Sequence, residues 1–262
     1  MIDSYKIKEI ARFSGLRPWQ QEKHYLQSLI LDIISDFRLI FKGGTYLWFF
    51  HGLNRFSDDL DFTATGSIKS DLPAYISSAL TLFGFENELK IMKNRSLGLS
   101  IRYMINGPLN TNEKDKCVIY VEISKREKII LPSMFLKVDF PQYDIPVKTL
   151  RGMNLDEVGA EKIRAILTRE KGRDIYDLFH LISRKNILLD TVLINEKLAF
   201  YNLTFDSAAF LKKIESRKTL FVKEMRPIIF GDLPEFDYVQ RSIEKWIVSP
   251  KYFEIGFFVN AY

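Results

Sequence analysis

The sequence predicts an α+β protein in which a mixed sheet is followed by a helical domain. Short apolar segments with strand composition, separated by Pro, Gly or polar residues, fill the first half of the chain. From Asn154 onward, apolar residues instead recur at the spacing of helices. With 262 residues, of which 47% are hydrophobic and 27% charged, the chain can bury two cores. We therefore expect a sheet domain over residues 1–150 and a helical domain over residues 151–262.

The sheet domain should begin with an amphipathic helix at Pro18, because a first helical turn tolerates proline. The apolar run Leu39–Phe41 predicts a buried strand. That strand should end at Gly43 and Gly44, after which Thr45 could cap a short apolar helix. This segment therefore predicts a strand, a glycine turn and a helix in succession.

The remaining elements follow from periodicity and from chain breaks. A helix over Leu72–Phe83 should end at Gly84. Further strands are expected at Leu60–Thr63, Leu97–Ile105, Val118–Ile123, Phe135–Phe140 and Val147–Leu150. Helices are expected at Asp156–Thr168, Asp174–Ser183, Thr191–Phe200, Ser207–Lys223 and Phe236–Val248.

The formal net charge of +5 is compatible with a polyanionic partner such as RNA, although a solvated basic surface would give the same balance. One expected helix, Ser207–Lys223, is especially basic and is where RNA contact is expected. Its bases are Lys212, Lys213, Arg217, Lys218 and Lys223.

Several classes of protein are excluded by composition. The single Cys117 argues against a disulfide framework or a cysteine metal site, and favours a cytoplasmic protein. No apolar run approaches the roughly 20 residues of a membrane span, and the N-terminus has no secretory pattern, so no membrane partner is expected. The aromatic segment Tyr252–Phe258 is expected to pack on the domain or on a partner.

The strongest chemical signal runs from Lys42 to Phe62. Two glycines before a helix let backbone N–H groups approach a phosphate, and the helix N-terminus adds partial positive charge. Asp59 and Asp61 alternate along a strand and so share a face, where Mg²⁺ would neutralise their mutual repulsion. The alternative is a solvated acidic turn paired with Arg55.

These residues resemble the AbiEii family of nucleotidyltransferase toxins, whose pattern is Gly-Gly-Thr followed by Arg-Phe-Ser-x-Asp-Leu-Asp-Phe. The resemblance extends to Gln21–Leu26 and to a second block, Glu161–Leu178, and covers roughly residues 5 to 185. It implies a polymerase-β-like fold and use of an NTP with Mg²⁺ or Mn²⁺. It also implies a role in a toxin–antitoxin or phage-defence pair, hence an antitoxin partner. Some members resemble enzymes that add nucleotides to the 3′ acceptor end of tRNA.

Such a site normally takes a third carboxylate from a neighbouring strand, and Glu122 is the best candidate. An unpaired carboxylate is costly to bury, so Glu122 should face metal or a base. A second metal ion shared with Glu122 would lower the pKa of the acceptor hydroxyl. The alternative is a plain ion pair with Lys125 or Arg126.

In the second block, Lys162 and Arg169 lie two helical turns apart and so share a face that could meet a triphosphate. The resemblance adds Asp174 as a functional residue, with Lys162 and Asp174 contributed by the helical domain to the active-site cleft. Asp177 could hold Arg173 four residues before it. The alternative is an ordinary ion-paired helix surface.

We therefore expect catalysis by Asp59, Asp61, Glu122, Lys162 and Asp174. Nucleotide binding is expected at Gly43, Gly44, Thr45, Ser57, Lys162 and Arg169, with Ser57 touching phosphate or metal-bound water. The reaction would move a nucleotide from an NTP to a hydroxyl, with the 3′ end of tRNA as acceptor. Transfer to a protein or small molecule, and a non-catalytic nucleotide-binding module, are the alternatives.

Overall fold

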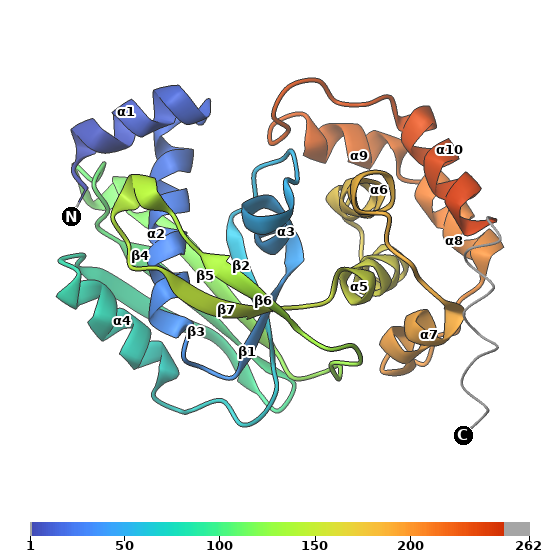
Figure 1. Ribbon diagram of the computed structural model, residues 1–262, viewed down its shortest axis with the longest axis horizontal. Helices are drawn as coiled ribbons and strands as arrows, with labels where there is room; N and C mark the ends of the chain where they lie inside the picture. Colours follow the sequence, from blue (N-terminus) through green and yellow to red (C-terminus); the bar gives the residue numbers. More distant parts are fainter. Residues whose placement is uncertain (1, 249–262) are drawn as a thin grey trace. The chain divides into compact units, whose positions relative to one another are not determined.

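The computed structural model describes residues 2–248 and divides into two compact units (Figure 1). The sheet unit comprises Met1–Tyr46, Asp58–Ile129 and Ser133–Gly152; the helical unit comprises Leu47–Ser57, Ile130–Pro132 and Met153–Tyr262. The change from strands to helices was expected near residue 151, and one unit boundary lies between Gly152 and Met153. Two short segments of the first half nevertheless belong to the helical unit. The expected packing of Tyr252–Phe258 lies outside the described residues.

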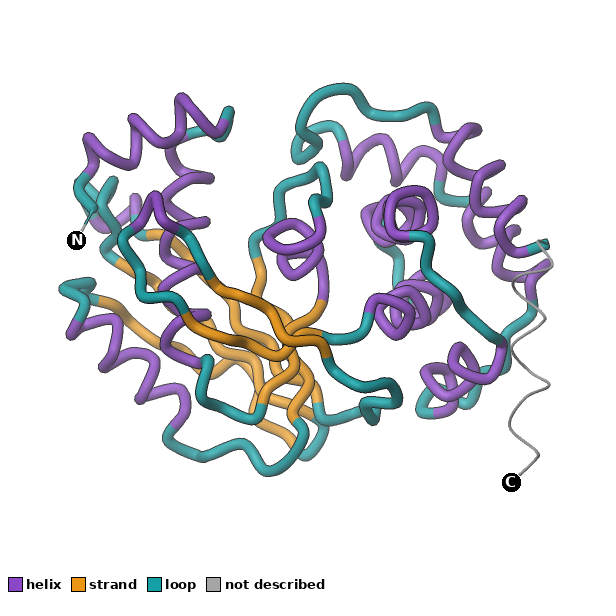
Figure 2. Tube along the Cα trace, in the orientation of Figure 1, coloured by secondary structure: helices purple, strands orange, loops and turns teal. Residues whose placement is uncertain are grey.

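The sheet unit contains a seven-stranded mixed sheet in the order β3-β4-β5-β2-β1-β7-β6 (Figure 2). Its strands are β1 (Leu39–Lys42), β2 (Asp59–Ala64), β3 (Asn87–Arg95), β4 (Gly98–Ile105), β5 (Cys117–Ser124), β6 (Met134–Val138) and β7 (Lys148–Gly152). The pairs β2/β5 and β1/β7 are parallel, whereas the other neighbours are antiparallel. The expected α+β fold is confirmed.

The two faces of this sheet differ in polarity. Leu60 and Phe62 of β2 point to one face and are fully buried, together with Val121 and Ile101 of the neighbouring strands. Helices α2 (Pro18–Ile34) and α4 (Leu72–Leu82) pack on β5, β6 and β3, and the hydroxyl of Tyr103 donates to a main-chain oxygen of α4. The opposite face carries the alternate, polar residues, and we call it the polar face.

Sequence reasoning missed two elements of the sheet unit and misplaced a third. Helix α1 (Ser4–Ser14) and strand β3 were not expected. In β3, eight of the nine side chains are exposed, so its sequence shows no apolar alternation. Helix α3 (Gly43–His51) begins at Gly43 rather than after a cap at Thr45. The positive φ of Gly43 turns the chain sharply enough for the helix to start directly after β1.

The helical unit is built around α5 (Leu155–Thr168) and α6 (Arg173–Lys185), which pack on each other (Figure 2). Helix α5 also contacts α7 (Thr191–Ala199) and α8 (Ser207–Glu215), while α6 contacts α9 (Lys218–Met225) and α10 (Phe236–Ile247). The single helix expected over Ser207–Lys223 is wrong. The Ser216 hydroxyl donates a hydrogen bond to the Lys213 carbonyl. Arg217 has a non-helical backbone and is the N-cap of α9.

The segment Leu47–Ser57 joins the helical unit through main-chain pairing. Arg55 forms a β-bridge with Ile229, and the Phe56 N–H donates to the Ile228 carbonyl at 2.7 Å. The Trp48 ring packs on the rings of Phe56 and Phe230. A segment next to the acidic motif in sequence thus packs with helices that follow much later in the chain.

Two further observations concern the described part of the chain. None of its helices combines the length and the apolar character needed to cross a lipid bilayer. Cys117 is buried and has a free thiol.

Candidate active site

Gly43 lies directly against Asp61 in the sheet unit. A Cβ atom built on Gly43 would lie 2.8 Å from the Cβ and 2.9 Å from the Cγ of Asp61, closer than packed carbon atoms allow. Gly43 also has φ of +81°, a conformation that other residues adopt with strain. Glycine is therefore required here both by the backbone and by the neighbouring carboxylate.

A row of polar residues crosses the polar face beside Gly43. Strand register places Lys42 opposite Asp61, Asp61 beside Glu122, and Glu122 opposite Ser100. Ser100 lies in turn opposite Lys93 of β3. Paired residues of adjacent strands point to the same face, so these five residues form one line across the sheet, which we call the polar row.

The surroundings of Glu122 in the polar row shift the pKa of its carboxyl. Burial raises the pKa of the Glu122 carboxyl, and the charge of Asp61 raises it further. The Ser100 hydroxyl donates to Glu122 Oε1 at 2.6 Å, which lowers this pKa in part, as do the charges of Lys93 and Arg126. Ser100 thus holds Glu122, where an ion pair with Lys125 or Arg126 was the expected alternative to metal binding.

Thr45 and Gly44 support β2 from the first turn of α3. The Thr45 hydroxyl is fully buried and donates to the main-chain oxygen of Asp59 at 2.5 Å. Gly44 is also buried. Thr45 therefore fixes the strand that carries Asp59 and Asp61, a positional role that was not anticipated.

The donor set of the sheet unit fits a hard divalent cation. Within residues 2–248, no three His, Cys, Asp or Glu side chains are gathered into a ready-made metal cluster. Mg²⁺, however, commonly takes only one or two protein carboxylates and completes its shell with water and phosphate. Asp59 and Asp61 are half-buried on one face of β2, and Gly43 packs directly against the Asp61 side chain. These residues suit such a site.

The helical unit holds a second group of charged residues, which we call the charged cluster. Arg55 donates from Nε and Nη2 to both carboxylate oxygens of Asp177, at 2.6 and 2.7 Å. Lys162 Nζ lies 3.0 Å from Asp174 and 2.6 Å from Asp177. Arg169 makes two bonds of 2.8 Å to Asp174.

The carboxylates of this cluster are deeply buried but strongly stabilised. Burial alone would raise the pKa of Asp174, but Lys162 and Arg169 outweigh it and hold the pKa well below its usual range. For Asp177, the charges of Arg55 and Lys162 likewise overcome burial and lower the pKa. The Lys162 side chain is only 8% exposed, whereas that of Arg169 is 49% exposed. Arg169 is thus the cation that also faces outward.

The sequence matches a known protein family over most of its length. Residues 25–244 match the family described as nucleotidyl transferase AbiEii toxin, type IV toxin–antitoxin system. The chain belongs to the AbiEii family. It is accordingly a nucleotidyltransferase toxin, and membership implies an NTP substrate and an antitoxin partner.

Solved structures share the fold of this AbiEii toxin. JHP933 from Helicobacter pylori has a TM-score of 0.57 at 18% identity, and the match covers 86% of this chain and 88% of that chain. MenT4, a nucleotidyltransferase toxin from Mycobacterium tuberculosis, has a TM-score of 0.54 at 23% identity, with 83% and 72% covered. No curated protein matches the sequence.

The residues predicted for the AbiEii site divide between the two units. Asp59, Asp61 and Glu122 meet on the sheet unit beside the glycine pair, whereas Lys162 and Asp174 meet in the helical unit. Ser57 is buried and belongs to the helical unit as well. Lys162 and Arg169 both bind Asp174, although Arg169 is the extended C-cap of α5 and not part of its helical face; contact of the two with a triphosphate stays a prediction.

Sequence reasoning missed several partners of these residues. Asp177 binds Arg55 and Lys162, where Arg173 was the expected partner. Alternation within β4 would have placed Ser100 on the polar face, but its pairing with Glu122 depends on register. The bond from Arg55 to Asp177 joins residues 122 positions apart, which no local pattern reveals.

Proposed function

We propose that this toxin binds Mg²⁺ or Mn²⁺ through Asp59 and Asp61, with help from Glu122, and transfers a nucleotide from an NTP to the 3′ end of tRNA. The observation that carries the proposal is the polar row. It places Asp61 beside Glu122, with Gly43 packed on the Asp61 carboxylate. The charge of Asp61 raises the pKa of the Glu122 carboxyl, and a bound cation would relieve this repulsion.

Asp59 and Asp61 are the residues that would hold the metal. A bound divalent ion would neutralise the phosphates of the nucleotide and polarise the phosphorus under attack. Thr45, through the Asp59 carbonyl, and Gly43, through its contact with Asp61, fix the position of β2. Transfer would then depend mainly on positioning and charge stabilisation.

The transfer step exchanges one phosphorus–oxygen bond for another. The acceptor hydroxyl oxygen bonds to the α-phosphorus, the bond to the bridging oxygen breaks, and pyrophosphate leaves. Glu122 accepts the hydroxyl proton in this proposal, because its raised pKa brings the carboxylate closer to the range of an effective general base. Ser100 orients Glu122 by donating to Oε1.

The charged cluster would bind nucleotide phosphate through Arg169, with Lys162 and Asp174 holding that guanidinium in place. Arg169 is suited to this role because its side chain is half-exposed while its guanidinium is held by Asp174. Arg169→Gln should therefore raise the KM for NTP roughly tenfold or more, the cost of a charge-assisted hydrogen bond. Arg184→Gln, which removes an exposed charge from α6, should leave KM unchanged.

An RNA acceptor is supported by the basic balance of the chain, and the proposed setting is the cytoplasm, within a toxin–antitoxin or phage-defence pair. The test is to incubate the protein with each radiolabelled NTP, divalent metal, and either total tRNA or total protein. Metal-dependent label in tRNA, absent with Asp61→Asn, supports the proposal. Label in the protein fraction alone would assign the enzyme to protein modification instead.

A further inference from the structure

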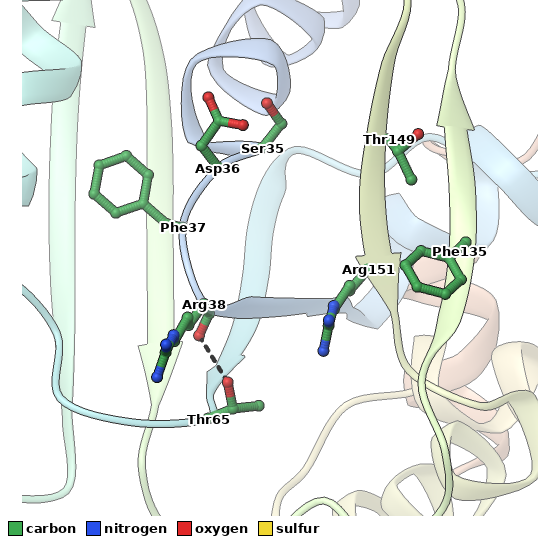
Figure 3. A pocket seen from close by; sticks show the side chains of 8 residues that line it. All are labelled: Ser35, Asp36, Phe37, Arg38, Thr65, Phe135, Thr149 and Arg151. Carbon is green, nitrogen blue, oxygen red and sulfur yellow. Dashed lines mark hydrogen bonds between the residues drawn. The ribbon is translucent and has the colours of Figure 1, made fainter.

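A pocket of about 560 Å³ opens on the sheet unit at the end of the sheet where β1 begins (Figure 3). Arg38 precedes β1, Thr65 follows β2, and Arg151 lies on β7. The remaining lining residues are Ser35, Asp36, Phe37, Phe135 and Thr149. Figure 3 shows the Arg38 and Arg151 side chains extending in the same direction from neighbouring segments.

The two guanidinium groups that line the pocket belong to Arg38 and Arg151. In residues 2–248, neither Arg38 nor Arg151 forms a side-chain hydrogen bond or ion pair. Arg151 instead lies over the Phe135 ring, 5.7 Å from its centroid, and Phe135 is 74% exposed. The carboxylate of the pocket, Asp36, has its own cation in Lys148 at 3.8 Å. The pocket therefore offers positive charge and an open aromatic ring together.

Strand register connects this pocket to the carboxylates. Gly152 pairs with Phe41, so Arg151 lies beside Ile40, on the same polar face as Lys42 and Asp61. From Asp61 to Arg151 the path crosses two strand spacings and runs two residues along the strands. Standard sheet dimensions place the two Cα atoms about 12 Å apart. Asp61 and Arg151 thus lie on the same face of the sheet, with the buried residues Lys42 and Ile40 between them.

We propose that this pocket binds the nucleotides that precede the acceptor 3′ end of a single-stranded RNA. Arg38 and Arg151 bind backbone phosphates, and Phe135 stacks on a base. The inference rests on the proposed function, because it assigns the acceptor strand a binding site on the same side of the sheet as Asp61. It adds three acceptor-binding residues to the site.

Single-stranded RNA fits this chemistry better than an acidic peptide or a free nucleotide. An acidic peptide would use the two arginines but gains nothing from an exposed aromatic ring beneath one of them. A free nucleotide would not need both Asp61 and Arg151, whose Cα atoms are placed about 12 Å apart by standard sheet dimensions. A strand uses charge, ring and distance together.

The test measures binding of a fluorescent ten-nucleotide single-stranded RNA by anisotropy, without NTP or metal so that no transfer occurs. The variant Arg38→Gln/Arg151→Gln is compared with Lys8→Gln/Arg12→Gln, which removes the same charge from exposed positions of α1. We expect the pocket variant to lose at least tenfold in affinity, and its log–log salt slope to fall by about 1.4, for two phosphate contacts. The α1 variant should match the wild type.

A second pair of variants tests the ring. Phe135→Ala should weaken binding about five- to hundredfold through lost stacking, whereas Phe13→Ala, at another exposed ring, should not. Equal losses in pocket and control variants, or none in either, would overturn the inference. So would displacement of the RNA by AMP, or by a Glu-rich decapeptide, at concentrations similar to unlabelled RNA.

These outcomes are separable from those of the proposed function. Unchanged RNA binding in the pocket variants, together with loss of tRNA labelling in Asp61→Asn, would refute the pocket and leave the transferase proposal standing. Weakened binding in the pocket variants, with no labelling of RNA by the wild type, would support the pocket and refute transfer to RNA. Melting temperatures should match the wild type because Arg38, Arg151 and Phe135 are exposed.

Discussion

The polar row of the sheet unit and the charged cluster of the helical unit both place carboxylates out of water, but they balance the charge differently. In the charged cluster, arginine and lysine hold the pKa values of Asp174 and Asp177 below normal despite burial. In the polar row, burial and a neighbouring carboxylate raise the pKa of Glu122. The carboxylates of the cluster are neutralised by its own lysine and arginines, whereas in the row the carboxylates of Asp61 and Glu122 lie side by side. We therefore assign metal binding to the row and phosphate binding to the cluster.

The largest expected effect is the loss of transfer in Asp61→Asn. Because the carboxylate would bind metal and face developing charge, we expect activity to fall about a thousandfold or more. The assay is incorporation of labelled NTP into tRNA at saturating divalent metal. Asp58→Asn, three residues earlier, should stay within a few-fold of the wild type, since no site role is assigned to it. Equal activity of the two variants would remove Asp61 from the site.

The charged cluster should respond in stability instead. Asp177→Asn removes the buried carboxylate that binds two nitrogens of Arg55 and leaves Lys162 with Asp174 alone, which should lower the free energy of unfolding by about 3–5 kcal/mol. Urea unfolding followed by circular dichroism measures this change. The matched control is Asp237→Asn, which breaks the exposed pair with Lys218 and should change the free energy of unfolding far less. Similar losses in both variants would contradict the view that the buried pair is structurally important.

Substitution of Gly43 tests two effects, the strain of its backbone conformation and its contact with Asp61. Gly43→Ala should cost about 1–2 kcal/mol for its positive φ, and should also displace Asp61 and reduce transfer at least tenfold. Gly15→Ala has nearly the same φ, +72°, but no atom within 4 Å of the added Cβ. It should show the stability cost alone. If both variants kept full activity, the contact with Asp61 would be unimportant for transfer.

The lowered pKa values of Asp174 and Asp177 predict acid sensitivity. A carboxyl with a folded pKa below its unfolded value of about 3.9 stabilises the fold above that value, and this stability is lost as pH falls through the folded pKa. We expect the free energy of unfolding to fall as pH drops below about 4. The decline should be shallower in Asp177→Asn, measured by urea titrations at several pH values. An identical slope in both proteins would argue against the paired state of Asp177.

The smallest effect concerns Arg217, which was expected to contact RNA. It is only 4% exposed, and neither of its terminal nitrogens has a hydrogen-bond partner in residues 2–248. Arg217→Met should therefore be neutral or raise the free energy of unfolding by about 1 kcal/mol. Lys212→Met, at an exposed position of α8, should change it by less than about 0.5 kcal/mol. A loss of 2 kcal/mol or more in Arg217→Met would show a structural role for the charge.

Local patterns predicted much of the sheet and the placement of its carboxylates. Alternation in β2 is visible in the sequence, so Asp59 and Asp61 could be assigned to one face. The same reasoning could not find β3, whose exposed side chains show no apolar periodicity. The same reasoning predicted one helix in place of α8 and α9, because the apolar spacing of a helix continues across the break at Ser216.

Pairings between distant segments could not be predicted. The salt bridge between Arg55 and Asp177 and the register that puts Glu122 opposite Ser100 depend on tertiary packing. Membership of Leu47–Ser57 in the helical unit likewise rests on main-chain pairing with residues 228–230. These contacts decide which charges are neutralised, and hence which region is left to bind metal.

Binding of Mn²⁺ tests the central claim most directly. Electron paramagnetic resonance can follow a Mn²⁺ titration of the wild type, Asp61→Asn, Asp58→Asn and Asp177→Asn in the absence of nucleotide. Our account predicts that Asp61→Asn weakens binding at least tenfold, whereas Asp58→Asn and Asp177→Asn bind as the wild type does. Undiminished Mn²⁺ binding by Asp61→Asn, or loss of binding in Asp177→Asn without unfolding, would contradict it.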